Sequence, residues 1–537
     1  MGAAVSHYPI TPANYNVFSI TIRSPDKLKV LDASDTVVDV VRMTLQNYYG
    51  AIQSEDIGAE GGHHFKLEGS PFSKSGGFGL SVASKFFFTK LVSKLYEVGW
   101  KLWLNSDLSR RYDNSTLFFR RCTPLNREFT ISCLSLSHYD KLQLINAPDA
   151  LYKVLLACVG NLRQKTEVYD NCYSIKMHGY LWETNSFEDS TNARLLILNI
   201  FRNFRFAGFA YFGTVNTKGT ADSIFFISDG TTLCHEEYCI MSLNAKDRLR
   251  LIDCPENLID MATETSTNRW PGGIQDQYRA GNLVEFKLTG YPWRAWGRED
   301  AVYSRLFISE LLKESVANGW AVLTSLDISR KANDKAIFVM RKCTPMRIPH
   351  FCIAPAEGDR IRIIGANPEL REIIADVIRQ CWTIGVQDES VNRWHFIWYN
   401  SRFQVGYAGD HELKLTGYPW ENNVVLARLM MTRILTSVET LGWSVICSAD
   451  VSAKYITTNS NGQKNEEVHS FLVYLRWLFH LNRYLPTCTL GLLRKLRCLR
   501  VLLLLPKVEL QHPLNHWMTI LLRHLTTKLF RTESDVH

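Results

Sequence analysis

Short segments in which apolar and polar residues alternate recur along the chain and predict β-strands. Phe129–Leu136 (FTISCLSL) and Glu237–Leu243 (EYCIMSL) are two examples. A charged turn follows each such segment and leads into a second alternating stretch, written DKLKVLDAS, DKLQLINAP, DRLRLIDCP or DRIRIIGAN. A period of two residues is typical of a strand with one buried face. Two strands are therefore predicted at the start of each copy of a repeated pattern.

Segments with helical periodicity come next. The first type begins at Pro255 (PENLIDMATETS), where an N-terminal proline and an early glutamate favour the start of a helix. The second type is the longest in the chain, REDAVYSRLFISELLKESVANGW, with Glu299 and Asp300 in its first turn and Gly319 at its end. Each copy is therefore predicted to contain a shorter and a longer helix.

A third strand is predicted between the two helices. The string EFKLTGYPW ends at Trp293 and returns as ELKLTGYPW, which ends at Trp420. Apolar and polar positions alternate in it, and Gly290 and Pro292 end the strand in the first of these copies. We interpret GYPW as a strand terminator in which both aromatic residues plug the core.

The dipeptide GW aligns four copies, because it occurs at Gly99, Gly319 and Gly442 and is replaced by Gly-Phe at Gly208. Two further strands close each copy. The fold class predicted is α+β: a tandem array of four homologous units of about 110 residues, each β-β-α-β-α-β-β, with a mainly antiparallel sheet and two helices. The predicted divisions are an arm at 1–16, repeats at 17–126, 129–233, 236–347 and 350–470, and a basic tail at 471–537.

Connections such as TPLNRE and TPMRIP are short, so neighbouring repeats should pack against each other and resemble a linear array. The sequence does not distinguish stacking in line from closing into pairs. Composition is that of a globular protein, with 46% hydrophobic and 21% charged residues. The net charge of +8 is concentrated in the tail, which contains ten Lys or Arg and three Asp or Glu. No nucleic-acid partner is therefore predicted. The cysteines lack metal-site spacing, so no metal or cofactor is predicted either.

Two cationic positions recur in all four copies. A strand lysine stands three residues before the glycine of each GYPW-like segment, and a helix cation stands fourteen residues before the glycine that ends each long helix. Alternation places the lysine opposite the apolar face, where solvation is the simplest interpretation. The helix cation projects along an apolar stripe and therefore needs a partner. The strand lysines are Lys66, Lys176, Lys287 and Lys414, and the helix cations are Lys85, Arg194, Arg305 and Arg428.

An Asp-x-Ser motif follows the strand after each GW and offers such a partner. It consists of Asp107 with Ser109, Asp327 with Ser329, and Asp450 with Ser452, and Asn216 is the counterpart in repeat 2. We predict that the helix cation and this residue pair inside each repeat and hold the helix to the strand end. The alternative is a grip on phosphate or carboxylate, or a hydrolytic site. No catalytic residue is assigned, because no histidine recurs at a matched position as a general base.

Both ends of the chain contain patterns associated with membranes. The start, MGAAVS, fits the motif for N-myristoylation at Gly2. One acyl chain holds a membrane only marginally, and Leu490–Leu505 could add a basic amphipathic helix. The tail has no counterpart in the other copies, so an alternative exon or an out-of-frame reading explains it equally well.

The motifs FKLTGYPW, the helix ending in GW, and S-x-D-x-S-[RA]-K resemble a family of uncharacterised multi-repeat proteins from animals and fungi. The resemblance covers about residues 1 to 470 and implies no activity. We expect a cytoplasmic, non-catalytic scaffold that binds other proteins or an anionic ligand, apposed to a membrane through Gly2. The alternative is a hydrolase or phosphate-ligand-binding enzyme that uses the Asp-x-Ser loops with nearby Lys or Arg.

Overall fold

The computed structural model describes residues 16–476, with gaps at 74–77, 109–112, 185, 218–220, 229, 231–234, 295–297, 330–334, 396–406, 422–423, 452–455, 459–463 and 467–469. The account below concerns the part of the chain up to Leu478. None of the helices in the described residues is both long and apolar enough to cross a membrane.

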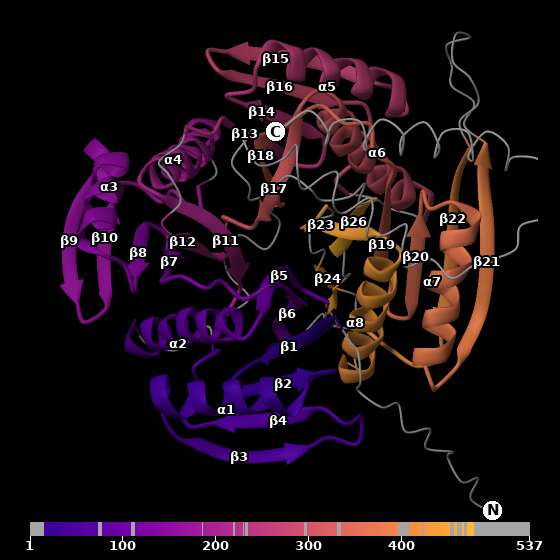
Figure 1. Ribbon diagram of the computed structural model, residues 1–537. Helices are drawn as coiled ribbons and strands as arrows, with labels where there is room; N and C mark the ends of the chain where they lie inside the picture. The colour runs from indigo at the N-terminus through magenta and orange to yellow at the C-terminus, as the bar shows by residue number, and fades with distance from the viewer. Residues whose placement is uncertain are drawn as a thin grey trace, which may run out of the picture. The chain divides into compact units, whose positions relative to one another are not determined.

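Four repeats follow one another, each with a six-stranded sheet and two α-helices in the described residues (Figure 1). Repeat 1 contains β1 (Val17–Arg23), β2 (Lys27–Leu31), α1 (Asp35–Tyr48), β3 (Ile52–Ile57), β4 (His63–Leu67), α2 (Phe78–Glu97), β5 (Trp100–Ser106) and β6 (Asp113–Arg121). Repeat 2 contains β7 (Thr130–Ser137), β8 (Lys141–Ile145), α3 (Asp149–Val159), a 3-10 turn (Gly160–Leu162), β9 (Arg163–Tyr169), β10 (Cys172–Met177), α4 (Phe187–Phe206), β11 (Phe209–Val215) and β12 (Ser223–Ser228).

The second half of the array repeats the same order. Repeat 3 contains β13 (Tyr238–Asn244), β14 (Arg248–Ile252), α5 (Glu256–Arg269), β15 (Ile274–Ala280), β16 (Leu283–Leu288), α6 (Arg298–Ala317), β17 (Trp320–Leu326) and β18 (Ile337–Lys342). Repeat 4 contains β19 (His350–Ala356), β20 (Arg360–Ile364), α7 (Pro368–Cys381), β21 (Val386–His395), β22 (Tyr407–Leu415), α8 (Val424–Thr440), β23 (Trp443–Asp450) and β26 (Ser470–Arg476), with a small hairpin, β24 (Ile456–Thr458) and β25 (Lys464–Glu466), before the last strand.

The α+β class and the fourfold repetition are confirmed, but each repeat has one more strand than the sequence pattern indicated. Every sheet is antiparallel, with the strand order β3-β4-β2-β1-β6-β5 in repeat 1 and its equivalent in the others. The additional strands are β3, β9, β15 and β21, which lie at one edge. Almost all residues of β3, β9 and β15 are exposed, so they show no alternation of apolar and polar residues that would identify a strand.

The assignment of the tail also needs correction at its start. The strand β26 pairs with β19 and β23 and closes the sheet of repeat 4, as β6 does in repeat 1. Residues 471–476, which we assigned to the basic tail on composition, therefore belong to repeat 4. The rest of that tail lies outside the described residues.

The two aromatic residues of GYPW differ in environment. Trp182, Trp293 and Trp420 are fully buried, and each indole Nε1 donates a hydrogen bond to a backbone oxygen at the start of the second strand, at 3.0, 2.8 and 2.9 Å. The neighbouring tyrosines are exposed, so the interpretation of both rings as plugs is wrong for the tyrosine. Only the indole joins the strand end to the core, because its apolar ring is buried and its N–H group donates a hydrogen bond at the same position.

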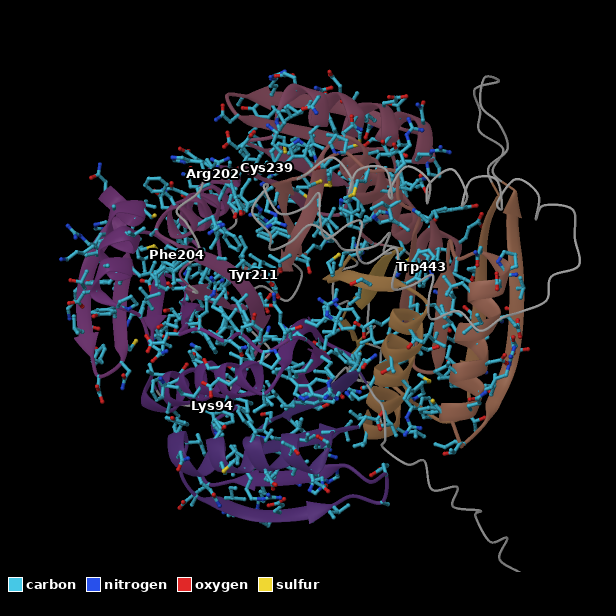
Figure 2. All side chains as sticks on the ribbon, viewed as in Figure 1. Lys94, Arg202, Phe204, Tyr211, Cys239 and Trp443 are labelled. Carbon is cyan, nitrogen blue, oxygen red and sulfur yellow. The ribbon has the colours of Figure 1, made fainter. Side chains whose placement is uncertain are left out.

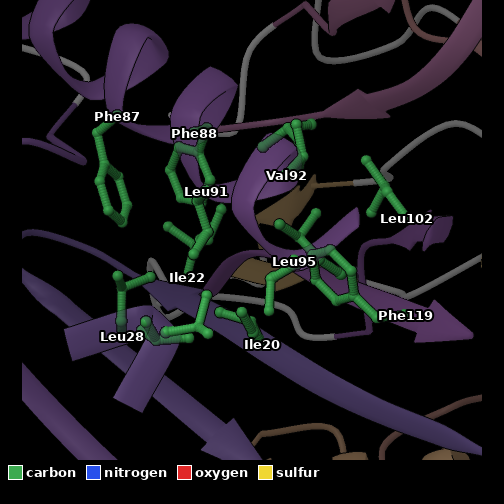
Figure 3. Packing of buried hydrophobic residues seen from close by; sticks show 14 of the residues in the cluster. Ile20, Ile22, Leu28, Phe87, Phe88, Leu91, Val92, Leu95, Leu102 and Phe119 are labelled. Carbon is green, nitrogen blue, oxygen red and sulfur yellow. The ribbon is translucent and has the colours of Figure 1, made fainter. Parts of the chain in front are cut away.

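Each sheet is covered on both faces. The two helices of a repeat pack on one face, which we call the inner face, and the long helix of a neighbouring repeat packs on the other, the outer face. The strands β13 and β19 are consequently buried along their whole length. Figure 3 shows the inner face of repeat 1, where Phe88, Leu91 and Leu95 of α2 lie over Ile20 and Ile22 of β1 and Leu28 of β2.

The long helices link the repeats in a closed cycle. The helix α2 contacts β7 of repeat 2, α4 contacts β13 of repeat 3, and α6 contacts β19 of repeat 4. The helix α8 then contacts β1 of repeat 1, where Thr432 and Ser19 hydroxyl oxygens lie 2.9 Å apart. The repeats are therefore in tandem, as expected, but the linear arrangement that we expected is wrong.

The closing contact can be tested at Phe118 of β6, which is buried in one cluster with the apolar residues of α8. We expect Phe118→Ala to lower the free energy of unfolding by about 3–5 kcal/mol, because it removes a large buried side chain. Hydrogen exchange followed by mass spectrometry should accelerate in α8. The matched variant is Phe225→Ala, which lies in the cluster of α2, and it should accelerate exchange in α2 instead. Unchanged exchange of α8 in Phe118→Ala would contradict the closed cycle.

Candidate functional site

The four helix cations are buried at the junctions between repeats. Each lies on the long helix that packs against the outer face of the next sheet, and none exposes more than 6% of its surface. A charge in such a position must be compensated by hydrogen bonds or by an opposite charge. The junctions are therefore the first place to look for chemistry. Their cations are Lys85, Arg194, Arg305 and Arg428.

At two junctions, the cation bonds directly to the following repeat. Lys85 donates to Gln143 of β8 at 3.2 Å, and Arg194 Nε donates to Ser242 of β13 at 2.8 Å. In the amide orientation that satisfies both of its neighbours, Asn244 accepts from Arg194 at 2.9 Å and donates to Ser242 at 2.8 Å. These bonds hold the helix of one repeat to the sheet of the next. The pairing predicted inside each repeat stays a prediction.

Two junctions also contain a buried carboxylate. Glu285 of β16 is 5% exposed and accepts from Arg248 at 2.8 Å and from Arg250 at 2.5 Å. Because β16 is covered on its outer face by α4, this glutamate is not solvated as a simple alternating strand would require. It is paired with two guanidinium groups. Removing one partner of such a buried ion pair costs free energy, because the other charge stays buried without compensation. Phe187 of α4 also stacks on Arg250, at 4.3 Å from ring centroid to guanidinium carbon.

The junction between repeats 3 and 4 uses the same arrangement with more ions. Glu412 of β22 accepts from Arg362 at 2.5 Å and from Arg360, and Arg298 of α6 lies 3.2 Å from it. Arg298 also binds Asp410 at 2.9 Å. Burial raises the pKa of Glu412, but the guanidinium groups, with Arg362 foremost, outweigh burial and hold the pKa below its usual value. The carboxylate is therefore ionised and structural.

A second cross-repeat contact involves a backbone position with a left-handed conformation. Asp32, Asn146 and Asp253 end the second strands with φ of 53°, 53° and 54°, values that Asp and Asn tolerate better than most residues. Each side chain meets a cation on a neighbouring long helix: Arg433 with Asp32 at 3.2 Å, Lys90 with Asn146 at 2.9 Å, and Arg202 with Asp253 at 2.6 Å. Figure 2 labels Arg202.

Repeat 4 has Gly365 at this position and so lacks a side chain for the contact. The sequence contains the signal for these residues, because the strings beginning DKL or DRL, and DRI in repeat 4, place Asp, Asn or Gly after the second strand. The sequence interpretation missed them.

The Asp-x-Ser motif is described in full only in repeat 3, where it follows the fifth strand, β17. Asp327 Oδ1 accepts from the backbone N–H of Ser329 at 3.1 Å, so the motif forms a local turn in which the aspartate side chain replaces a backbone acceptor. The recurrence of Asp-x-Ser has a structural explanation at this position. Asp222 of repeat 2 joins the same region, since its Oδ2 accepts from the backbone N–H of Asp327 at 2.8 Å.

Hydrogen bonds in this region also run through all four repeats. Asn105 of repeat 1 donates to Asp222 of repeat 2 at 3.4 Å. Ser325 of repeat 3 donates to the backbone oxygen of Ser448 in repeat 4, and Ser448 in turn donates to Ser106 of repeat 1 at 2.8 Å. Tyr211, labelled in Figure 2, adds a bond of 2.8 Å from repeat 2 to Thr324 of repeat 3. Asp222 and Ser448 are therefore inter-repeat connectors.

The strand lysines point away from the inner face, as predicted, but they are not all fully solvated. Lys66 is exposed, while Lys176, Lys287 and Lys414 are half-buried. Lys176 and Lys414 each lie 3.8 Å from an aspartate in the turn between the first two strands of their own repeat. These pairs are partly exposed and contribute little to stability.

Several predicted residues lie outside the described residues or only partly within them. Gly2, Ser109 and Ser452 are among the residues that the structure does not describe, and Asp450 is described only as the last residue of β23. Asp107 follows β5, and Ser329 is buried. In the described residues, no group of three or more His, Cys, Asp or Glu is placed to hold a metal ion.

One buried histidine lies at the junction between repeats 3 and 4. His350 Nδ1 donates to the backbone oxygen of Ile348 at 2.8 Å, and its Nε2 is buried with no hydrogen-bond partner among the described residues. Burial lowers the pKa of His350 to about 4, against the effect of the hydrogen bond, and Lys313 of α6 also lowers it while Glu310 raises it. The imidazole is therefore neutral in the folded protein.

A profile of an uncharacterised domain family matches the chain four times, over residues 16–120, 130–230, 237–341 and 349–471. These matches cover most of the chain and coincide with the four sheets. No curated protein and no solved structure matches the chain.

The buried ion cluster of repeat 3 predicts a large effect for Glu285→Gln. We expect the free energy of unfolding to fall by about 3–5 kcal/mol, because the substitution leaves the buried guanidinium group of Arg250 without its carboxylate. Denaturant unfolding measures the change. Glu256→Gln is the control, since Glu256 pairs with Arg279 at the surface and should leave stability nearly unchanged. Equal effects of the two substitutions would show that the buried cluster does not stabilise the junction.

His350 predicts a pH dependence. Unfolded His350 binds a proton near its ordinary pKa of 6.5, whereas the folded residue resists protonation down to about 4. Stability is therefore complete above pH 6.5 and falls as the pH decreases toward 4, by about 2 kcal/mol at pH 5 from this residue. His350→Val introduces the residue found at the matched position of repeat 1, Val17. Denaturant unfolding at pH 7 and pH 5 should show a smaller difference for this variant, and an unchanged difference would refute the assignment.

Proposed function

The chain belongs to this family of uncharacterised repeated domains, and from the geometry of its repeats we propose that it is a non-catalytic scaffold that binds other proteins through a surface repeated along the array. The observation that carries the proposal is the exposure of the tyrosines in GYPW and in its counterpart in repeat 2, GYLW. Tyr180, Tyr291 and Tyr418 expose 65%, 48% and 55% of their surface, although the tryptophan two residues later is buried. Packing explains the tryptophan but not a large ring in solvent.

Each exposed tyrosine lies against the turn between the first two strands of its repeat. Tyr180 packs edge-on against Tyr139 at 6.1 Å, and Lys246 lies 4.1 Å above the centre of the Tyr291 ring. These contacts fix the rings with little loss of entropy on binding, and tyrosine is one of the residue types that dominate binding energy in protein interfaces. A partner segment with apolar side chains would match the rings, and a carboxylate in that segment would match Lys246 beside Tyr291.

The closed cycle supports binding at several points at once. The repeats are held to one another by buried ions and apolar clusters, so their surface features keep fixed spacings. A partner that contains two suitable segments then binds more tightly, because its second segment binds at a high effective concentration once the first is bound. Repeat 1 lacks this tyrosine and has Ser70 in its place, so three of the repeats provide the surface.

The enzymatic alternative has less support. The Asp327 carboxylate accepts a hydrogen bond from the backbone N–H of Ser329 in its own loop, and the Asp222 carboxylate accepts one from the backbone N–H of Asp327, which connects repeats 2 and 3. A nucleophile or a general base needs a reactive group directed toward a substrate. We therefore assign the Asp-x-Ser loops to the structure of the array.

Attachment to a membrane through a myristoyl group on Gly2, and a cytoplasmic location, form the second part of the proposal. The sequence motif supports it, and the intact mass of the native protein tests it. A mass without the acyl group would remove this part and leave protein binding unaffected.

The tyrosine surface is tested by the triple variant Tyr180→Ser, Tyr291→Ser and Tyr418→Ser. The proteins retained by the immobilised full-length chain are identified by quantitative mass spectrometry. One of them is then purified, and its affinity is measured by calorimetry. We expect the triple variant to bind it at least tenfold more weakly, because the exposed rings supply the apolar contact, while the thermal unfolding temperature changes little.

A matched control replaces three other exposed apolar residues by serine: Met43, Tyr278 and Val391, which expose similar fractions of their surface. This control should bind as the wild type does. The proposal fails if the tyrosine variant retains full affinity, or if no purified protein binds the wild type.

A further inference from the structure

A cavity of about 570 Å³ opens at one end of the sheet of repeat 2. It crosses the ends of all six strands and the start of α3. Several of its lining positions differ from the matched positions of the other repeats, which makes it a feature of this repeat. Its lining consists of Thr130, Asn146, Ala147, Pro148, Val168, Tyr169, Asn171, Cys172, Tyr173, Phe209 and Ser228.

Two differences from repeats 1 and 4 leave less side-chain bulk at this end of the sheet. The fifth strand begins with tryptophan in repeats 1, 3 and 4 but with Phe209 in repeat 2. In repeat 1, Trp100 packs edge-on against Phe18 at 4.8 Å, and repeat 4 has the same pair at 4.8 Å. The strand register places Ser132 of repeat 2 at the position of Phe18. Repeat 2 therefore has a phenyl ring and a hydroxyl group where repeats 1 and 4 have two aromatic side chains and repeat 3 has Trp320 and Cys239.

Repeat 2 also adds aromatic rings around the opening. The register matches Tyr169 to Ala280 of repeat 3, and it matches Tyr173 to Val284. Tyr173 is stacked against Tyr152 of α3, with ring centroids 4.2 Å apart, so its ring has a fixed orientation. Tyr169 is 43% exposed at the rim. The cavity therefore combines a smaller side chain, Phe209, with the flat aromatic rings of Tyr169 and Tyr173.

The polar groups of the lining are neutral. None of the lining residues carries a charged side chain. Asn146 is held by Lys90 and by the backbone oxygen of Ile131, which fixes one wall. The side chains of Thr130, Asn171 and Ser228 make no hydrogen bond to another residue in the described part of the chain, so their donors and acceptors remain available to a ligand.

We propose that this cavity binds a neutral carbohydrate. Faces of pyranose rings that carry C–H groups pack on aromatic rings, and hydroxyl groups pair with amide and hydroxyl side chains. Small-molecule sites commonly combine such apolar walls with a few placed polar groups. No lining residue offers a counter-charge to an ionised ligand, so the lining favours a neutral one. The site is separate from the tyrosine surface and does not depend on it.

Ligand-observed saturation-transfer NMR with the full-length protein tests the proposal. The probes are the methyl glycosides of glucose, galactose, mannose and N-acetylglucosamine, and glucose 6-phosphate serves as the charged comparison. We expect transfer to at least one methyl glycoside and at least tenfold less transfer to the phosphate. Absence of transfer to every neutral probe would overturn the proposal.

Two variants locate the binding. Phe209→Trp restores the indole of the other repeats and should reduce transfer at least tenfold by filling the cavity, without lowering the thermal unfolding temperature. Tyr169→Ala removes a ring at the rim and should also weaken binding, and its exposure makes it tolerable if Phe209→Trp fails to fold. Tyr278→Ala, at an exposed tyrosine of repeat 3, is the control and should leave transfer unchanged. Full transfer in both cavity variants would refute the site.

Discussion

The sharing of each long helix between two sheets is the constraint on which the rest of the structure depends. One side of the helix completes the core of its own repeat, and the other covers the outer face of the next sheet. A sheet with an uncovered outer face would expose a row of apolar strand residues to water, which costs free energy in proportion to the area. No repeat is therefore complete alone, and stability belongs to the contacts between neighbours as much as to the repeats. The burial of β13 and β19 on both faces follows directly from this arrangement.

The polar residues at the junctions give the cycle its order. Four homologous repeats with identical outer faces could associate with the wrong neighbour, since the apolar contacts would be similar. The junctions differ instead: Lys85 meets an amide in repeat 2, Arg194 meets hydroxyl and amide groups in repeat 3, and Arg298 meets carboxylates in repeat 4. A mismatched pairing would bury a charge without its partner, which costs far more than a lost apolar contact. The polar residues of the junctions thus contribute to correct assembly as well as to stability.

Much of the architecture was predictable from the sequence. The four repeats, both helices and most strands follow from periodicity and from GYPW. The edge strands were missed because β3, β9 and β15 are exposed on both faces and so show no apolar alternation. The sharing of helices was missed because the residue pattern of a single repeat predicts only one buried face of its sheet. For the same reason we treated the opposite face, which contains Glu285, as solvated. Among the site residues, the helix cations recur and are buried, as their place on the apolar stripe indicated. The hydrogen bonds of Lys85 and Arg194 to the next repeat could not be predicted, because the local sequence does not specify where the next repeat lies. The cavity of repeat 2 required the register, since only pairing of strands shows that Ser132 stands where Phe18 does.

The contact between α8 and β1 has a geometric consequence for how such a protein can change in length. In an open solenoid, one more copy adds one more interface and leaves the others intact. Here an additional repeat would have to separate α8 from β1. Loss of a repeat would leave one long helix and one sheet face without a partner to cover them. The copy number is thereby fixed by the angle through which successive repeats turn, so variation among related chains should concentrate in loops and in the residues of single repeats rather than in the number of repeats.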